Sequence, residues 1–138
     1  MDKSEIINQV EVNLFEGYSL WEGFSLPPLC ENERNLIPKE AISCYSGEYS
    51  SDFATACQSF YLFRKLHEKD KENSQESTLL GDYFFSVFSK HLIPIDNTEL
   101  IEGFADFLAV DTVREVKGKE EFSFDKYFEF IRCISLVI

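Results

Sequence analysis

Basic residues are scarce in this sequence. Only 13 lysines and arginines stand against 25 aspartates and glutamates, which gives a formal net charge of −12. Phosphate backbones and anionic lipid surfaces repel such a chain, so nucleic acids and membrane surfaces are poor candidate partners. The negative charge favours solubility, and it would also steer the chain toward a basic patch on a partner protein.

Long apolar runs and paired cysteines are also missing. No stretch approaches the roughly 20 apolar residues of a membrane-spanning helix, and residues 1–5 lack the basic start of a secretory signal. The cysteines form no Cys-x-x-Cys pair and have no histidine at zinc-finger spacing; they are Cys30, Cys44, Cys57 and Cys133. We therefore expect a cytoplasmic protein without a membrane span, whose thiols are free and buried.

Catalytic motifs are absent as well: the sequence has no glycine-rich phosphate loop, nucleophile elbow or metalloprotease helix. His67 and His91 each end an apolar segment, where the negative end of a helix dipole favours them, and neither has an identifiable serine or cysteine partner. Glu68 and Glu72 would share one helical face, which is a spacing suited to Mg²⁺. Because no second acidic cluster completes such a site, we predict a solvated helix end there. No catalytic residue, metal or cofactor is assigned to this chain.

Apolar residues are abundant by contrast. They make up 44% of the 138 residues, and the aromatic share of 15% includes fourteen phenylalanines. A chain of this length can bury roughly two-thirds of its unfolded surface in one core, so we expect residues 1–138 to form a single domain. The aromatic share exceeds what one small core needs, which suggests that some rings lie at an interface.

Apolar residues recur every three or four positions in most segments, which predicts an all-α fold, a compact helical bundle. Asp2-x-x-Glu5 and Asp96-x-x-Glu99 are capping-box patterns at two helix starts. Glycines and prolines between Gly17 and Pro38 should interrupt any long helix there. We expect helices over residues 2–14, 31–36, 41–45, 51–71, 78–91, 100–116 and 123–138.

The segment from Thr78 to His91 is apolar on nearly every side, which predicts a helix central to the domain. Gly81 costs roughly 1 kcal/mol relative to alanine inside a helix, and Asp82 on such a helix needs a hydrogen-bond partner. The pair predicts a close helix crossing at Gly81 and a polar anchor or rim at Asp82. The candidates for a partner interface are Phe84, Phe85 and Phe88.

Two segments resemble a known family. Residues 53–67, which end in His67, are similar to the helix of trans-prenyltransferases that opens the first Asp-rich motif. About ten residues later, Leu79-Leu80-Gly81-Asp82-Tyr83 resembles the Leu-x-Gly-Asp-Tyr helix of that family. The family-motif positions are therefore His67, Gly81, Asp82 and Tyr83. The resemblance covers roughly residues 51–116, and the short length looks most like the small subunit of two-component polyprenyl diphosphate synthases, such as heptaprenyl diphosphate synthase.

The departures from the family pattern concern its catalytic residues. Catalytic members carry Asp-Asp-x-x-Asp where this chain has Glu68-Lys69-Asp70-Lys71, and their diphosphate-binding basic segment has no counterpart between Pro27 and Glu40. Arg64 stands where family residues line the product tunnel, and a charge there is costly unless it is paired.

The resemblance thus implies a non-catalytic accessory subunit with part of the isoprenoid synthase fold. Its partner would be a large subunit that carries both Asp-rich motifs and the Mg²⁺ ions. The heterodimer would elongate allylic primers with isopentenyl diphosphate, often for a quinone side chain. Two alternatives stay open: a generic helical interaction module or homodimer, and a small enzyme or ligand-binding protein that uses Glu68, Glu72 and Asp82.

Overall fold

The computed structural model describes residues 2–16, 31–67, 75–117 and 122–138. Within these ranges the chain forms six α-helices and no β-strand, which confirms the predicted all-α fold. The helices are α1 (Lys3–Phe15), α2 (Glu31–Cys44), α3 (Ser50–Leu66), α4 (Gln75–Leu92), α5 (Thr98–Val116) and α6 (Phe124–Ile134). Two short 3-10 helices, η2 (Ile93–Ile95) and η3 (Ser135–Val137), follow α4 and α6.

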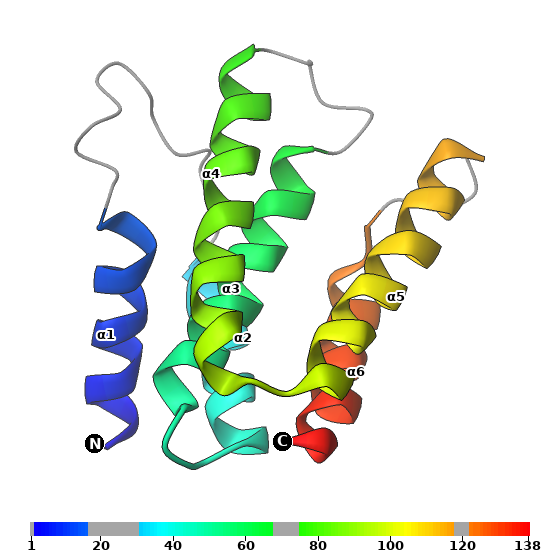
Figure 1. The fold of residues 1–138 in the computed structure, drawn as a ribbon. Coiled ribbons are helices and arrows are strands. Elements are labelled where there is room, and N and C mark those ends of the chain that lie inside the picture. The colour runs from blue at the N-terminus through cyan, green and yellow to red at the C-terminus, as the bar shows by residue number, and fades with distance from the viewer. Residues whose placement is uncertain (1, 17–30, 68–74, 118–121) are drawn as a thin grey trace.

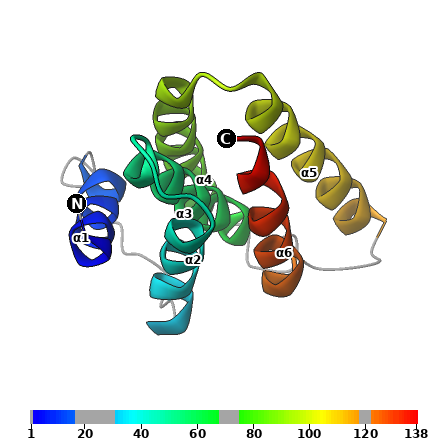
Figure 2. The same cartoon turned by 90° about the horizontal axis from the view of Figure 1, so that it is seen from below.

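Helix α3 is the centre of the domain. It packs along α4 and also contacts α2 and α1, while α6 packs on α2 (Figure 1). Figure 2 shows α1 on one flank and α5 on the other. The prediction that residues 78–91 form the central helix is wrong: α4 leaves Leu79 and Phe85 partly exposed. Small buried residues such as Ala54 and Ala56 let neighbouring helices approach α3 closely, so α3 is covered on most of its surface.

The N-cap prediction is confirmed for α1 and wrong for α5. In α1, the Asp2 carboxylate accepts from the Glu5 backbone N–H at 2.8 Å, and the Asp2 backbone N–H donates to Glu5 at 3.2 Å. In α5, the Asn97 side chain accepts from the Leu100 backbone N–H at 3.0 Å. Asp96 has a left-handed backbone, with φ of 49°, because it ends η2. The capping role therefore passes to the next residue.

Helix α2 runs without interruption through Pro38, so the predicted break at this proline is wrong. A proline inside a helix costs about 3 kcal/mol through the missing N–H and the steric clash one turn earlier. Burial of Ile37 and Ile42, at 0% and 4% exposed, offsets this cost, since each buried isoleucine contributes about 1.5–3 kcal/mol. Packing thus outweighs local propensity here.

A cluster of aromatic rings around Phe60 holds four helices together. The side chain of Phe60 on α3 is 1% exposed. Its ring centroid lies 5.3 Å from that of Phe88 on α4, 5.3 Å from that of Phe104 on α5 and 5.5 Å from that of Tyr127 on α6. Such ring pairs add about 0.5–1.5 kcal/mol each beyond the area they bury. This phenylalanine thus links α3 to α4, α5 and α6.

The thiols differ in exposure. Cys57 is buried, its pKa is raised well above the ordinary value by desolvation, and its carbonyl oxygen accepts a short hydrogen bond from Tyr127. Cys44 is half-buried, whereas Cys133 is exposed, so the prediction of a buried thiol is wrong for Cys133. Cys133 follows the exposed Arg132 on α6, and both side chains reach the surface of the described part of the chain. Cys30 lies outside the described residues.

We expect Phe60→Ala to lower the free energy of unfolding by about 3–5 kcal/mol, because it removes a buried ring and leaves a cavity among four helices. Urea denaturation followed by circular dichroism measures the change. Val12→Ala is the control, since Val12 is 61% exposed on α1 and its truncation should change stability by less than about 0.5 kcal/mol. Equal effects of the two substitutions would contradict the role assigned to Phe60.

Candidate functional site

The structure brings three of the four family-motif positions together. The His67 ring lies against α4, with Nε2 at 3.0 Å from the Thr78 carbonyl oxygen and 3.4 Å from an Asp82 carboxylate oxygen. A Cβ placed on Gly81 would lie 2.2 Å from the His67 ring, so no larger residue fits here without moving that ring. The predicted close approach at Gly81 is confirmed, and Asp82, at 64% exposed, forms the predicted polar rim.

Tyr83, the fourth motif position, points away from this cluster. Its hydroxyl donates to the Leu14 carbonyl oxygen at 2.7 Å and so joins α4 to the end of α1. A helical residue two positions after Gly81 cannot share its face. Tyr83 therefore acts in interhelical packing and is separate from His67 and Asp82.

The metal candidates Glu68 and Glu72 lie outside the described residues. In the part of the chain that the structure describes, no group of three or more His, Cys, Asp or Glu side chains is placed to hold a metal ion. His91 is 8% exposed, and its Nδ1 lies 2.8 Å from the Asp52 carboxylate. This histidine thus links α4 to the first turn of α3, a pairing that the sequence did not indicate.

The prediction of an interface position is wrong for two of the three phenylalanines. Phe84 and Phe88 are 0% and 6% exposed, because the chain's own helices cover them. Phe85, at 38% exposed, does reach the surface, and its ring lies tilted against that of Phe63 with centroids 4.9 Å apart. Only this member of the set is available to a partner.

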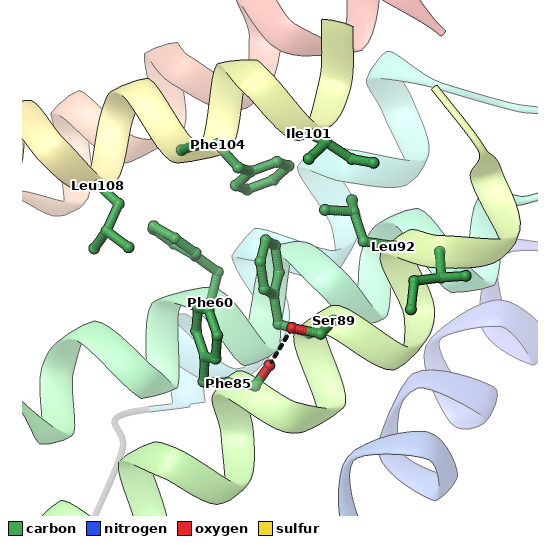
Figure 3. A pocket seen from close by; sticks show the side chains of 10 residues that line it. Phe60, Phe85, Ser89, Leu92, Ile101, Phe104 and Leu108 are labelled. Carbon is green, nitrogen blue, oxygen red and sulfur yellow. Dashed lines mark hydrogen bonds between the residues drawn. The ribbon is translucent and has the colours of Figure 1, made fainter. Parts of the chain in front are cut away.

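Phe85 lines an apolar groove between α4 and α5, with a cavity volume of about 290 Å³ (Figure 3). The buried rings of Phe60, Phe88 and Phe104 form its floor. Ser89 also lines it, and its hydroxyl donates to the Phe85 carbonyl oxygen at 3.1 Å, so this polar group is already satisfied. The groove therefore presents apolar surface to an incoming group.

Helix α5 continues this apolar surface outside the groove. Ile101, Ala105, Ala109 and Val113 recur at every fourth position and are all exposed. Residues four apart form one ridge along a helix. We call these four residues the α5 ridge. The spacing was present in the sequence, but only the structure shows that all four positions are exposed and that Ile101 and Ala105 also line the groove.

A buried ion pair fixes α5 in place. Arg64 on α3 donates through Nε and Nη2 to one Asp111 carboxylate oxygen, at 2.9 and 2.6 Å. The two side chains are 5% and 13% exposed, and the guanidinium also lies 5.6 Å from the centre of the Phe122 ring. The charge of Arg64 is thus compensated inside the domain. Because Asp111 lies on the side of α5 that faces α3, the pair orients the α5 ridge outward.

Comparison with known proteins returned no relative: no family model, no curated protein and no solved structure matches this chain. Among the described helices, none is long and apolar enough to cross a membrane.

The contact between Gly81 and His67 makes the effect of Gly81→Ala depend on residue 67. In a His67→Ala background, we expect Gly81→Ala to stabilise the protein by about 0.5–1 kcal/mol, because alanine is the better helix former. In the natural background the new Cβ displaces the His67 ring, and the gain should vanish or reverse. A double-mutant cycle measured by thermal and urea unfolding tests this coupling. Additive effects would show that the ring does not need the space at Gly81.

Substitutions of Arg64 and Asp111 should also have strongly coupled effects on stability. We expect Asp111→Leu to lower stability by about 3–5 kcal/mol, because it leaves a buried guanidinium without its carboxylate. Adding Arg64→Met to this variant should restore part of the loss, since two apolar residues replace the pair. Urea unfolding of both single variants and the double variant gives the coupling energy. A double variant as destabilised as the sum of the single variants would contradict the pairing.

Proposed function

We propose that this chain is a cytoplasmic, non-catalytic accessory subunit of a polyprenyl diphosphate synthase. It would pair with a large catalytic subunit and support that subunit's activity or set the length of its product. The resemblance of residues 53–67 and 79–83 to trans-prenyltransferases supports the family. The two Asp-rich motifs and the Mg²⁺ ions would lie on the large subunit.

The observation that carries the pairing role is the exposed apolar surface on α4 and α5. Phe85, Ile101 and Val113 are 38%, 44% and 51% exposed, and the first two border a groove with an aromatic floor. Isolated surface leucines or valines are ordinary, but contiguous apolar surface beside a groove marks interaction sites. The same surface would also suit the second candidate, a helical interaction module that associates with itself.

Reconstitution with the large chain of a two-component polyprenyl diphosphate synthase tests the proposal. Each chain alone should yield little long-chain product from farnesyl diphosphate, isopentenyl diphosphate and Mg²⁺, whereas the mixture should be active. Chromatography of the labelled products measures chain length, and light scattering measures the size of the complex. Condensation by this chain alone, or no response from any large chain, would contradict the proposal.

A pair of surface variants makes the test specific. Phe85→Asp should abolish the effect on the large subunit, because it places a charge at the border of the groove. Val12→Asp introduces the same charge at an exposed valine on α1 and should leave the effect intact. Circular dichroism spectra of both variants check that the helices are retained.

A further inference from the structure

The size of the groove between α4 and α5 indicates what can occupy it. Pockets for cofactors and other small molecules generally measure about 300–1,000 Å³. At about 290 Å³, this one lies at the lower edge of that range, and it is open to the surface along α5. A cavity of this kind fits one or two large apolar side chains that project from a partner, as anchor residues do in protein interfaces.

The surface beside the groove is shaped for a helix. The α5 ridge spans residues 101 to 113, which is about 18 Å along a helix at 1.5 Å per residue. Ala105 and Ala109 in its middle are small, so the backbone of another helix can approach closely and pack its own ridge alongside. An amphipathic helix with apolar residues at positions i, i+3, i+4 and i+7 would match this surface.

The border of this surface is negative beside the groove, whereas Arg114 and Lys117 lie at its far end, beside Val113. Glu102 and Asp106 are exposed on α5 beside the ridge, and within the described residues neither has an ion-pair partner. Both lie beyond the first turn of α5, so the helix dipole does not account for them. Across the groove, Asp82 is exposed on α4 one turn before Phe85. Basic residues on an occupant would therefore be attracted on both sides.

The net charge also favours a different protein over a second copy of this chain as the occupant of the groove. A symmetric dimer through this face would bring together two chains that each carry a net charge of −12. Like charges opposed across an interface cost free energy and slow association. A partner of another sequence, with lysines or arginines beside its apolar face, has no such cost.

We propose that the groove between α4 and α5 receives one amphipathic helix of a different protein. A large apolar side chain of that helix enters the cavity above Phe60, Phe88 and Phe104, and its basic flanks face Glu102, Asp106 and Asp82. This inference deepens the proposed function, since it specifies the binding segment of a partner subunit. It does not depend on the identity of that subunit.

Three fluorescein-labelled synthetic helices of 18 residues test the proposal by fluorescence anisotropy with the full chain. One carries leucine and phenylalanine anchors flanked by lysines, one has the same anchors flanked by glutamates, and one has the lysines but glutamines in place of the anchors. The first should bind at least about tenfold more tightly than either of the others, and added salt should lower its affinity. Equal binding of all three, or of both lysine peptides, would overturn the proposal.

Matched variants locate the binding site. Ala105→Trp should weaken the lysine-flanked peptide by about tenfold or more, because the indole fills the groove, whereas Val12→Trp on α1 should not. Glu102→Lys with Asp106→Lys should remove the preference for lysine flanks. Glu48→Lys with Asp125→Lys makes the same change in net charge at exposed positions elsewhere and should largely preserve the preference. Equal effects of test and control variants would show general charge attraction only, and would overturn the proposal.

A measurement on the unmodified chain covers the case in which a variant fails to fold. Methyl resonances of Ile101 should shift on addition of the lysine-flanked peptide, while those of Ile42, buried at 4% exposure, should not. A stable homodimer that Ala105→Trp dissociates would identify a second copy as the occupant and would overturn the proposal. Because no synthase subunit takes part, these results are independent of the reconstitution assay.

Discussion

The contact of Phe60 with three other helices is the constraint on which the rest of the structure depends. Its ring joins α3 to α4, α5 and α6 at centroid distances of 5.3–5.5 Å. The same ring, with Phe88 and Phe104, forms the floor of the groove. The stability of the domain and the proposed binding surface therefore depend on the same residues, and the aromatic excess in the composition supplies both the core and the floor of the groove.

Charges inside the domain are paired, and those at the candidate site are exposed. Arg64 is compensated by Asp111, and His91 lies beside Asp52 at 2.8 Å, so each buried charge or imidazole has a carboxylate from another helix. Buried ion pairs of this kind contribute little net stability against apolar replacements, but they select one arrangement of helices. Here they fix α5 and α4 on α3, and this leaves Glu102 and Asp106 facing water.

Most helix positions could be predicted because the apolar residues that recur every three or four positions are the ones that the helices bury. The capping box at Asp2 could be predicted because its contacts join residues only three positions apart. Local rules failed where tertiary contacts decide: Pro38 is tolerated because Ile37 and Ile42 are buried, and Asn97 replaces Asp96 as the cap of α5 because Asp96 ends η2.

The candidate site was only partly predictable. The cost of Gly81 inside a helix indicated a close approach, but the ring that fills the space belongs to His67, fourteen residues earlier at the end of α3. Composition could not separate exposed Phe85 from buried Phe84 and Phe88, because all three lie within little more than one turn of an apolar helix and only packing decides which face stays open.

The connection between α4 and α5 gives the groove a direction. Helix α4 leads into η2, α5 begins at Thr98 soon after it, and the two helices diverge from this connection (Figures 1 and 2). The groove lies at the joined end, because Leu92, Ile93 and Ile101 line it. The proposed occupant would therefore contact both helices at this end and α5 alone farther along, beside Ala109 and Val113. Its two ends would meet different surfaces, and this difference would fix the orientation of the bound helix.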